Sequence, residues 1–94
     1  MQLPGYLMPV LAMLRRAFPE GVPDGDYLPL LVVLREGLSE RNLAVVVAEL
    51  MDDEIVVVDN DAAAAVSVRR PPATEVVRLR DRLIAVGWEP DELP

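Results

Sequence analysis

The chain contains no Cys, so non-covalent contacts, chiefly the packing of apolar side chains, have to hold its fold together. Without Cys, neither a disulfide nor a thiolate metal site can staple the 94 residues. Hydrophobic residues make up 52% of the sequence, which is enough for a core and far from the composition of disordered chains. Since a chain of this length forms at most one domain, we expect a single helical domain over residues 1–94.

The first predicted helix covers residues 5–18. Leu7, Leu11 and Leu14 recur at intervals of four and three residues, as apolar residues do on one face of a helix. Pro9 has no backbone N–H and fits a helix only in its first turn, so the regular helix should begin near Leu7. The proline that follows this stretch should end it.

Two further helices are predicted on either side of a Gly-Leu-Ser sequence. We expect Asp26 to cap the second helix, Pro29 to lie in its first turn, and Gly37 to follow its end in the left-handed conformation. Ser39 is expected to cap the third helix. The apolar residues of the third helix, which recur at helical spacing, are Leu43, Val46, Val47 and Leu50.

Residues 55–68 are open to two interpretations. Residues 55–58 are all β-branched, which favours a short strand, and residues 59–61 would then be a turn or a helix cap. Residues 62–68 could return as the second strand of a hairpin, or form a helix; Ala favours the helix. The sequence therefore predicts an all-α bundle of about five short helices, with a winged-helix-like fold carrying a small β-hairpin at 55–68 as the alternative.

A last helix is predicted after the two prolines at 71–72. Thr74 is expected to cap it, Gly87 to end it, and Trp88 to fold back onto the core. Its apolar residues are Val76, Leu79, Leu83 and Val86.

Most side chains that do chemistry near neutral pH are absent. All nine basic residues are Arg, so no His or Lys can activate a hydroxyl nucleophile, and a P-loop would lack its Lys. We therefore expect no enzyme and no cofactor, although a pair of carboxylates could still provide an acid and a base. No metal site is expected either. Weak candidates for one, as oxygen ligands of a hard cation, are Asp52, Asp53, Glu54, Asp59 and Asp61.

The net charge of −7 disfavours nucleic acid as a partner, because attraction to phosphates supplies most non-specific affinity. Nucleic-acid binding remains an alternative, because the second and third helices could form a helix-turn-helix in which Arg41 and Asn42 read bases. Its candidate basic patch consists of Arg69, Arg70, Arg78, Arg80 and Arg82. No apolar run is long enough to cross a membrane, and the first ten residues have no basic leader pattern, so we expect a cytoplasmic protein.

The first predicted helix is apolar around much of its circumference, which indicates either a central core helix or a contact surface. Met and aromatic residues suit adaptable interfaces. The candidate interaction surface consists of Tyr6, Met8, Ala12 and Met13. We therefore expect a non-enzymatic protein-interaction module that binds a protein partner or itself, with a nucleic-acid binder and a carboxylate metal or small-ligand binder as alternatives.

Several short motifs resemble a small actinobacterial family, the domain of unknown function 3349. The most specific is the turn Pro-Glu-Gly-Val-Pro at 19–23. The others are Leu3-Pro4-Gly5, Asp26-Tyr27, Leu30-Leu31 through Leu34-Arg35, Leu38-Ser39 to Glu49-Leu50, and 82–88. The resemblance extends over almost the whole chain and is weaker between residues 52 and 70. It implies a small, mainly helical, cytosolic protein with no assigned activity, and it supplies no catalytic residues.

Overall fold

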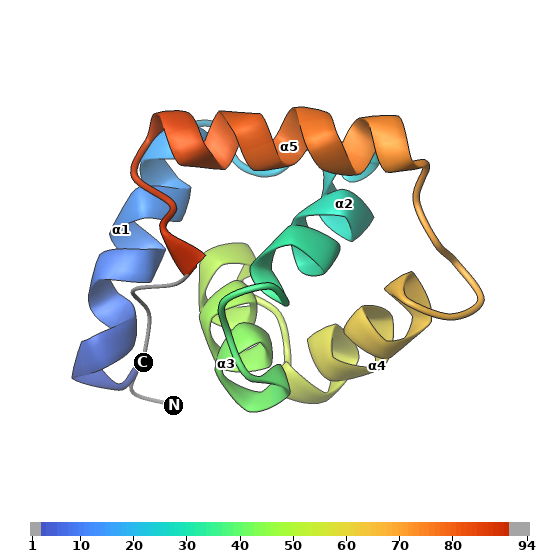
Figure 1. The fold of residues 1–94 in the computed structure, drawn as a ribbon. Helices are drawn as coiled ribbons and strands as arrows, with labels where there is room; N and C mark the ends of the chain where they lie inside the picture. The colour runs from blue at the N-terminus through green and yellow to red at the C-terminus, as the bar shows by residue number, and fades with distance from the viewer. Residues whose placement is uncertain (1–2, 91–94) are drawn as a thin grey trace.

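The computed structural model describes residues 3–90, and this part of the chain contains five α-helices and one short 3-10 helix (Figure 1). The 3-10 helix Gly5–Leu7 leads directly into the first α-helix. The helices are α1 (Met8–Ala17), α2 (Asp24–Leu34), α3 (Glu40–Met51), α4 (Ile55–Ala65) and α5 (Ala73–Ala85). Residues 3–90 contain no strand, so the all-α prediction is confirmed and the hairpin of the winged-helix alternative is wrong.

The helix α2 lies at the centre of the bundle (Figure 1), and it is apolar from Tyr27 to its end. It packs against α4 and α5, while α3 packs against α1 and α4. The helix α5 crosses one end of the bundle and contacts both α1 and α2. The core is continuous through these contacts and includes the fully buried residues Leu14, Leu31, Val46, Val58 and Leu79.

Several predicted helix boundaries are confirmed. Pro9 lies in the first turn of α1, which ends at Ala17, and Ser39 caps α3 by accepting a 3.2 Å hydrogen bond from the Asn42 backbone N–H. Gly87 follows α5 with a left-handed φ of +111°, a conformation that favours glycine. Trp88 is only 3% exposed and folds back onto the core as expected.

Three predicted caps are wrong. The helix α2 begins at Asp24, so Asp26 lies within its first turn, and Pro29 lies inside the helix rather than in that turn. Thr74 is the second residue of α5, which begins after Pro72 without a side-chain cap. Gly37 does not have a positive φ, because the chain leaves α2 through further helical turns whose N–H groups bond the last carbonyls of the helix.

The predicted strand at 55–58 is also wrong, because these residues form the first turn of α4 and residues 59–61 continue the helix. Val58, Ala62 and Ala65 lie on one side of α4 and are buried in the core. Burial of this side outweighs the β-propensity of the four branched residues. The helix predicted at 62–68 is confirmed as far as Ala65, after which the chain turns.

Candidate interaction surface

The side of α4 that faces away from the core is exposed; its middle carries no charged residue, and the exposed Asp59 lies at its margin. Its members lie on one side of the helical wheel and are Val56, Val57, Asn60, Ala63 and Ser67. The side chains of Val56 and Val57 are 59% and 39% exposed. Ser67 follows the end of α4, and its hydroxyl donates a 2.7 Å hydrogen bond to the Ala63 carbonyl. We call these five residues the α4 outer face.

The α4 outer face is unusual for a helix at the edge of a bundle. Surface helices normally present a polar side to water, whereas helices that are apolar all round are buried. The peripheral helix α4 instead exposes Val56, Val57 and Ala63 on its outer side, while its two acids, Asp59 and Asp61, lie toward the margins of that side. Within the described part of the chain, α4 therefore presents apolar surface that no other element covers.

Charges of opposite sign flank this face. Three exposed acids, Asp52, Asp53 and Glu54, immediately precede α4, and two exposed arginines, Arg69 and Arg70, follow it. The three acids have no ion pair within 4.0 Å among residues 3–90. The helix thus has an acidic end, an uncharged outer face and a basic end.

The two arginines at the basic end are only weakly held by their own chain. The Nη1 atom of Arg69 lies 4.0 Å from the nearer carboxylate oxygen of Asp61, and the Arg69 side chain is 60% exposed. The Nε of Arg70 donates to the carbonyl of Val66 at 3.1 Å, and no carboxylate of residues 3–90 lies within 4.0 Å of it. Both guanidinium groups are therefore free to pair with carboxylates of another molecule.

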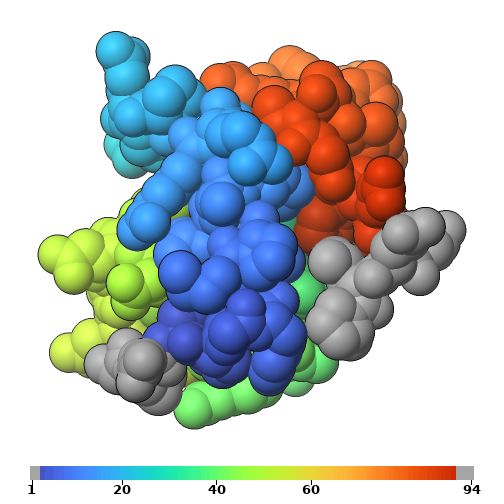
Figure 2. All heavy atoms as spheres, turned by 90° about the vertical axis from the view of Figure 1, so that its left-hand side faces the viewer, coloured from blue at the N-terminus to red at the C-terminus, as the bar shows by residue number. Residues whose placement is uncertain are grey.

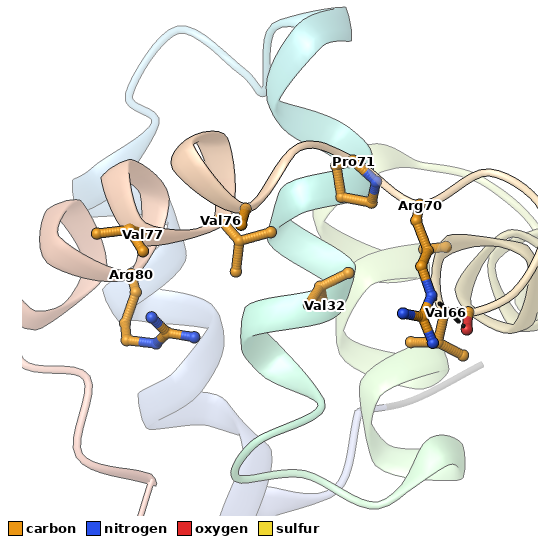
Figure 3. A pocket seen from close by; sticks show the side chains of 9 residues that line it. Val32, Val66, Arg70, Pro71, Val76, Val77 and Arg80 are labelled. Carbon is orange, nitrogen blue, oxygen red and sulfur yellow. Dashed lines mark hydrogen bonds between the residues drawn. The ribbon is translucent and has the colours of Figure 1, made fainter.

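A groove adjoins the basic end of α4 (Figure 3). It has a volume of about 400 Å³ and lies between α2, α5 and the connection from α4 to α5. Val32 and Val76 line its middle, and Arg70 and Arg80 lie at opposite ends. Arg80 is already paired with Glu36 through both carboxylate oxygens. The groove widens the apolar area next to α4 but contains no set of groups for a reaction.

The arginines of α5 hold the bundle together. Arg78 donates to Asp26, the one buried charged residue in the described part of the chain, and also to Glu75. Arg82 donates to the Ala17 carbonyl at 2.7 Å and stacks over the ring of Phe18. Three of the five residues of the predicted basic patch are thus engaged inside the molecule, which leaves Arg69 and Arg70.

The candidate metal ligands are not brought together. Asp52, Asp53 and Glu54 lie in the turn before α4, and Asp59 is exposed on that helix. Asp61 instead accepts a 2.7 Å hydrogen bond from the hydroxyl of Tyr27. Between residues 3 and 90, no group of three or more acidic, His or Cys side chains is arranged to hold a metal ion.

Burial raises the pKa of the Tyr27 hydroxyl above its ordinary value, and the hydrogen bond to Asp61 raises it further. The bond joins α2 to α4, and it requires the protonated phenol as donor. The contact between these helices is therefore strongest below the pH at which tyrosine ionises.

The interaction surface predicted on α1 is only partly exposed. The helix lies on the face shown in Figure 2, between α3 and α5. Tyr6, Met8 and Ala12 are exposed, and the Tyr6 hydroxyl donates to the Asn42 side chain at 3.0 Å. Met13 is 4% exposed and belongs to the core, so it is not available at this surface. The helix α1 is amphipathic, as a helix with one buried side should be.

Three comparisons with known proteins bear on identity. A family model described as "Protein of unknown function (DUF3349)" matches residues 5–92. No curated protein and no solved structure matches the chain. No helix between residues 3 and 90 is both long enough and apolar enough to span a membrane.

Proposed function

The chain belongs to the DUF3349 family, whose function is unknown, and we propose that it is a non-enzymatic protein-interaction module. We place its contact surface on the α4 outer face. The observation that carries this proposal is that α4 lies at the edge of the bundle and exposes Val56 and Val57 on its side away from the core. Contiguous exposed apolar surface between polar residues is typical of protein contact sites.

The residue inventory supports the non-enzymatic part of the proposal. A nucleophile needs an activating base, and the chain has no His, Lys or Cys. Carboxylates line two hollows beside α4, one with Glu40 and Asp59 and the other with Asp52 and Asp53, and neither hollow offers a His, Lys or Cys. Apolar contact across a helix face needs none of these groups, and it uses the residues that α4 presents.

The experiment that tests this function is affinity capture with matched variants. Tagged wild-type protein and the variants Val56→Asp and Ile84→Asp are each used to capture proteins from cells that express the chain, and the products are quantified by mass spectrometry. Val56 and Ile84 are similarly exposed, but Ile84 lies on α5. Val56→Asp places a charge on the α4 outer face, whereas Ile84→Asp adds the same charge elsewhere.

We expect a stoichiometric protein, either this chain or another, to be captured by the wild type and by Ile84→Asp and lost with Val56→Asp. Circular dichroism of each variant verifies that it is folded. Capture that is equally strong with all three proteins would reject the α4 outer face as the contact site. Recovery of no stoichiometric protein by the wild type, together with no self-association at millimolar concentration, would reject the function itself.

A further inference from the structure

We propose that the α4 outer face binds a second copy of this chain, with the two α4 helices antiparallel across a two-fold axis. This inference rests on the proposed function and names the partner. It is argued from three properties of α4: the symmetry of its outer face, the opposite charges at its two ends, and the lack of close intrachain ion pairs for those charges.

The outer face is suited to pair with itself. Its central residues are Val56, Asn60, Ala63 and Ser67, at successive intervals of four, three and four residues. This spacing reads the same in both directions, so a two-fold axis at its centre places Val56 of one copy against Ser67 of the other, and Asn60 against Ala63. An isologous dimer requires such a self-complementary patch. The small side chains allow the two helices to approach closely.

The same register brings opposite charges together. It brings Asp53 and Glu54 of one copy next to the turn of the second copy that carries Arg69 and Arg70, at both ends of the helix pair. The acids have no ion-pair partner within residues 3–90, and the arginines are only weakly held. Antiparallel packing therefore brings opposite charges together at both ends, whereas parallel packing would bring like charges together. Charge complementarity of this kind fixes the orientation of a contact.

The size of the contact determines how the dimer should behave. The helix α4 has 11 residues and is about 16 Å long. A contact centred on one such helix per copy is smaller than a standard stable interface. The dimer should therefore dissociate on dilution, so its dissociation constant can be measured by sedimentation equilibrium over a wide concentration series.

The decisive experiment uses two charge-reversal variants and their mixture. One variant is Arg69→Glu/Arg70→Glu, and the other is Asp53→Arg/Glu54→Arg. Each variant alone has like charges at both ends of the α4 pair, so its self-association should weaken by at least ~10-fold. The mixture should form a heterodimer about as tight as the wild-type dimer. At one end, the unchanged acids of the first variant meet the unchanged arginines of the second. At the other end, the two reversed pairs meet, and they again have opposite charges.

The controls separate a specific contact from a general effect of charge. Arg15→Glu changes an exposed arginine on α1, outside the proposed contact, and should leave the wild-type dissociation constant unchanged. Val56→Asp should abolish association although it leaves the charges at both ends of α4 unchanged. Thermal melts of the dilute variants verify that each one is folded.

Three results would overturn the inference, and each is distinct from failure of the proposed function. Wild-type protein that stays monomeric at millimolar concentration excludes the dimer. If Arg15→Glu weakens self-association as much as the charge reversals at the ends of α4, net charge alone determines the dissociation constant. If the mixture of the two reversal variants does not associate, the antiparallel register is excluded. If capture from cells remains sensitive to Val56→Asp in any of these cases, the function stands and the partner is a different protein.

Discussion

Replacement by alanine should destabilise the fold at one valine of α4 and hardly affect it at another valine two residues away. Val58 is fully buried, and Val58→Ala removes two carbon atoms from the core. Each buried carbon group contributes about 0.8 kcal/mol of transfer free energy, and the cavity left behind adds a further cost. The free energy of unfolding should therefore fall by about 2–3 kcal/mol. Because alanine has a higher helix propensity than valine, about 0.5 kcal/mol of this loss is offset, so the expected net loss of stability is about 2 kcal/mol.

Val56→Ala makes the same chemical change at a side chain that is 59% exposed. Here little core packing is lost and the gain in helix propensity nearly offsets it, so stability should stay within about 0.5 kcal/mol of wild type. For a domain of this size, Val58→Ala should lower the melting temperature by roughly 8–16 °C. Val56→Ala should hardly move it.

Urea unfolding of dilute protein, monitored by circular dichroism, measures both changes without a contribution from association. The comparison tests the helix directly, because residues two apart share one face of a strand but lie on different sides of a helix. Equal losses for the two variants would refute a helical α4 and restore the strand. A change in the slope of the transition would instead indicate that a variant alters the unfolded state.

Two further predictions concern polar contacts between helices. Asp26→Ala removes the buried carboxylate that bonds to an arginine of α5, so it should lower the urea midpoint clearly more than Asp24→Ala, which changes an exposed neighbour. The pKa of the Tyr27 hydroxyl is higher in the folded state than in the unfolded state. The contribution of Tyr27 to the free energy of unfolding is therefore fully present below the unfolded pKa of about 10, and it is lost as pH rises further. Tyr27→Phe should therefore flatten the alkaline fall in melting temperature, whereas Tyr6→Phe should not; identical profiles would contradict this account.

The helix pattern was predictable where local signals agreed with packing. The apolar spacing of α1, the Ser39 cap of α3 and the Gly87 turn after α5 each depend on residues close together in the chain, and all three are confirmed. Asp26 is different. Its hydrogen-bond partner, Arg78, lies 52 residues further along, and a contact of that range leaves no local signal.

The candidate surface was missed because residues 55–58 were interpreted as a strand. Their β-branched side chains favour a strand locally, and only packing of Val58, Ala62 and Ala65 on the core decides for a helix. Helical spacing applied through residues 55–68 would have revealed an uncharged stripe opposite these three. The α1 surface was predicted from residue type alone, which cannot show that Met13 points into the core.

The core contacts are unevenly distributed along the chain, and this has a consequence for hydrogen exchange. The helices α2 and α3 each bury six residues, whereas α4 buries three, two of them alanines, and α5 buries two leucines. Local opening is least costly where few apolar contacts are lost. Amide protons of α4 and α5 should therefore exchange before those of the first half of the domain. The region we assign to binding is the one whose protection a bound partner would increase most.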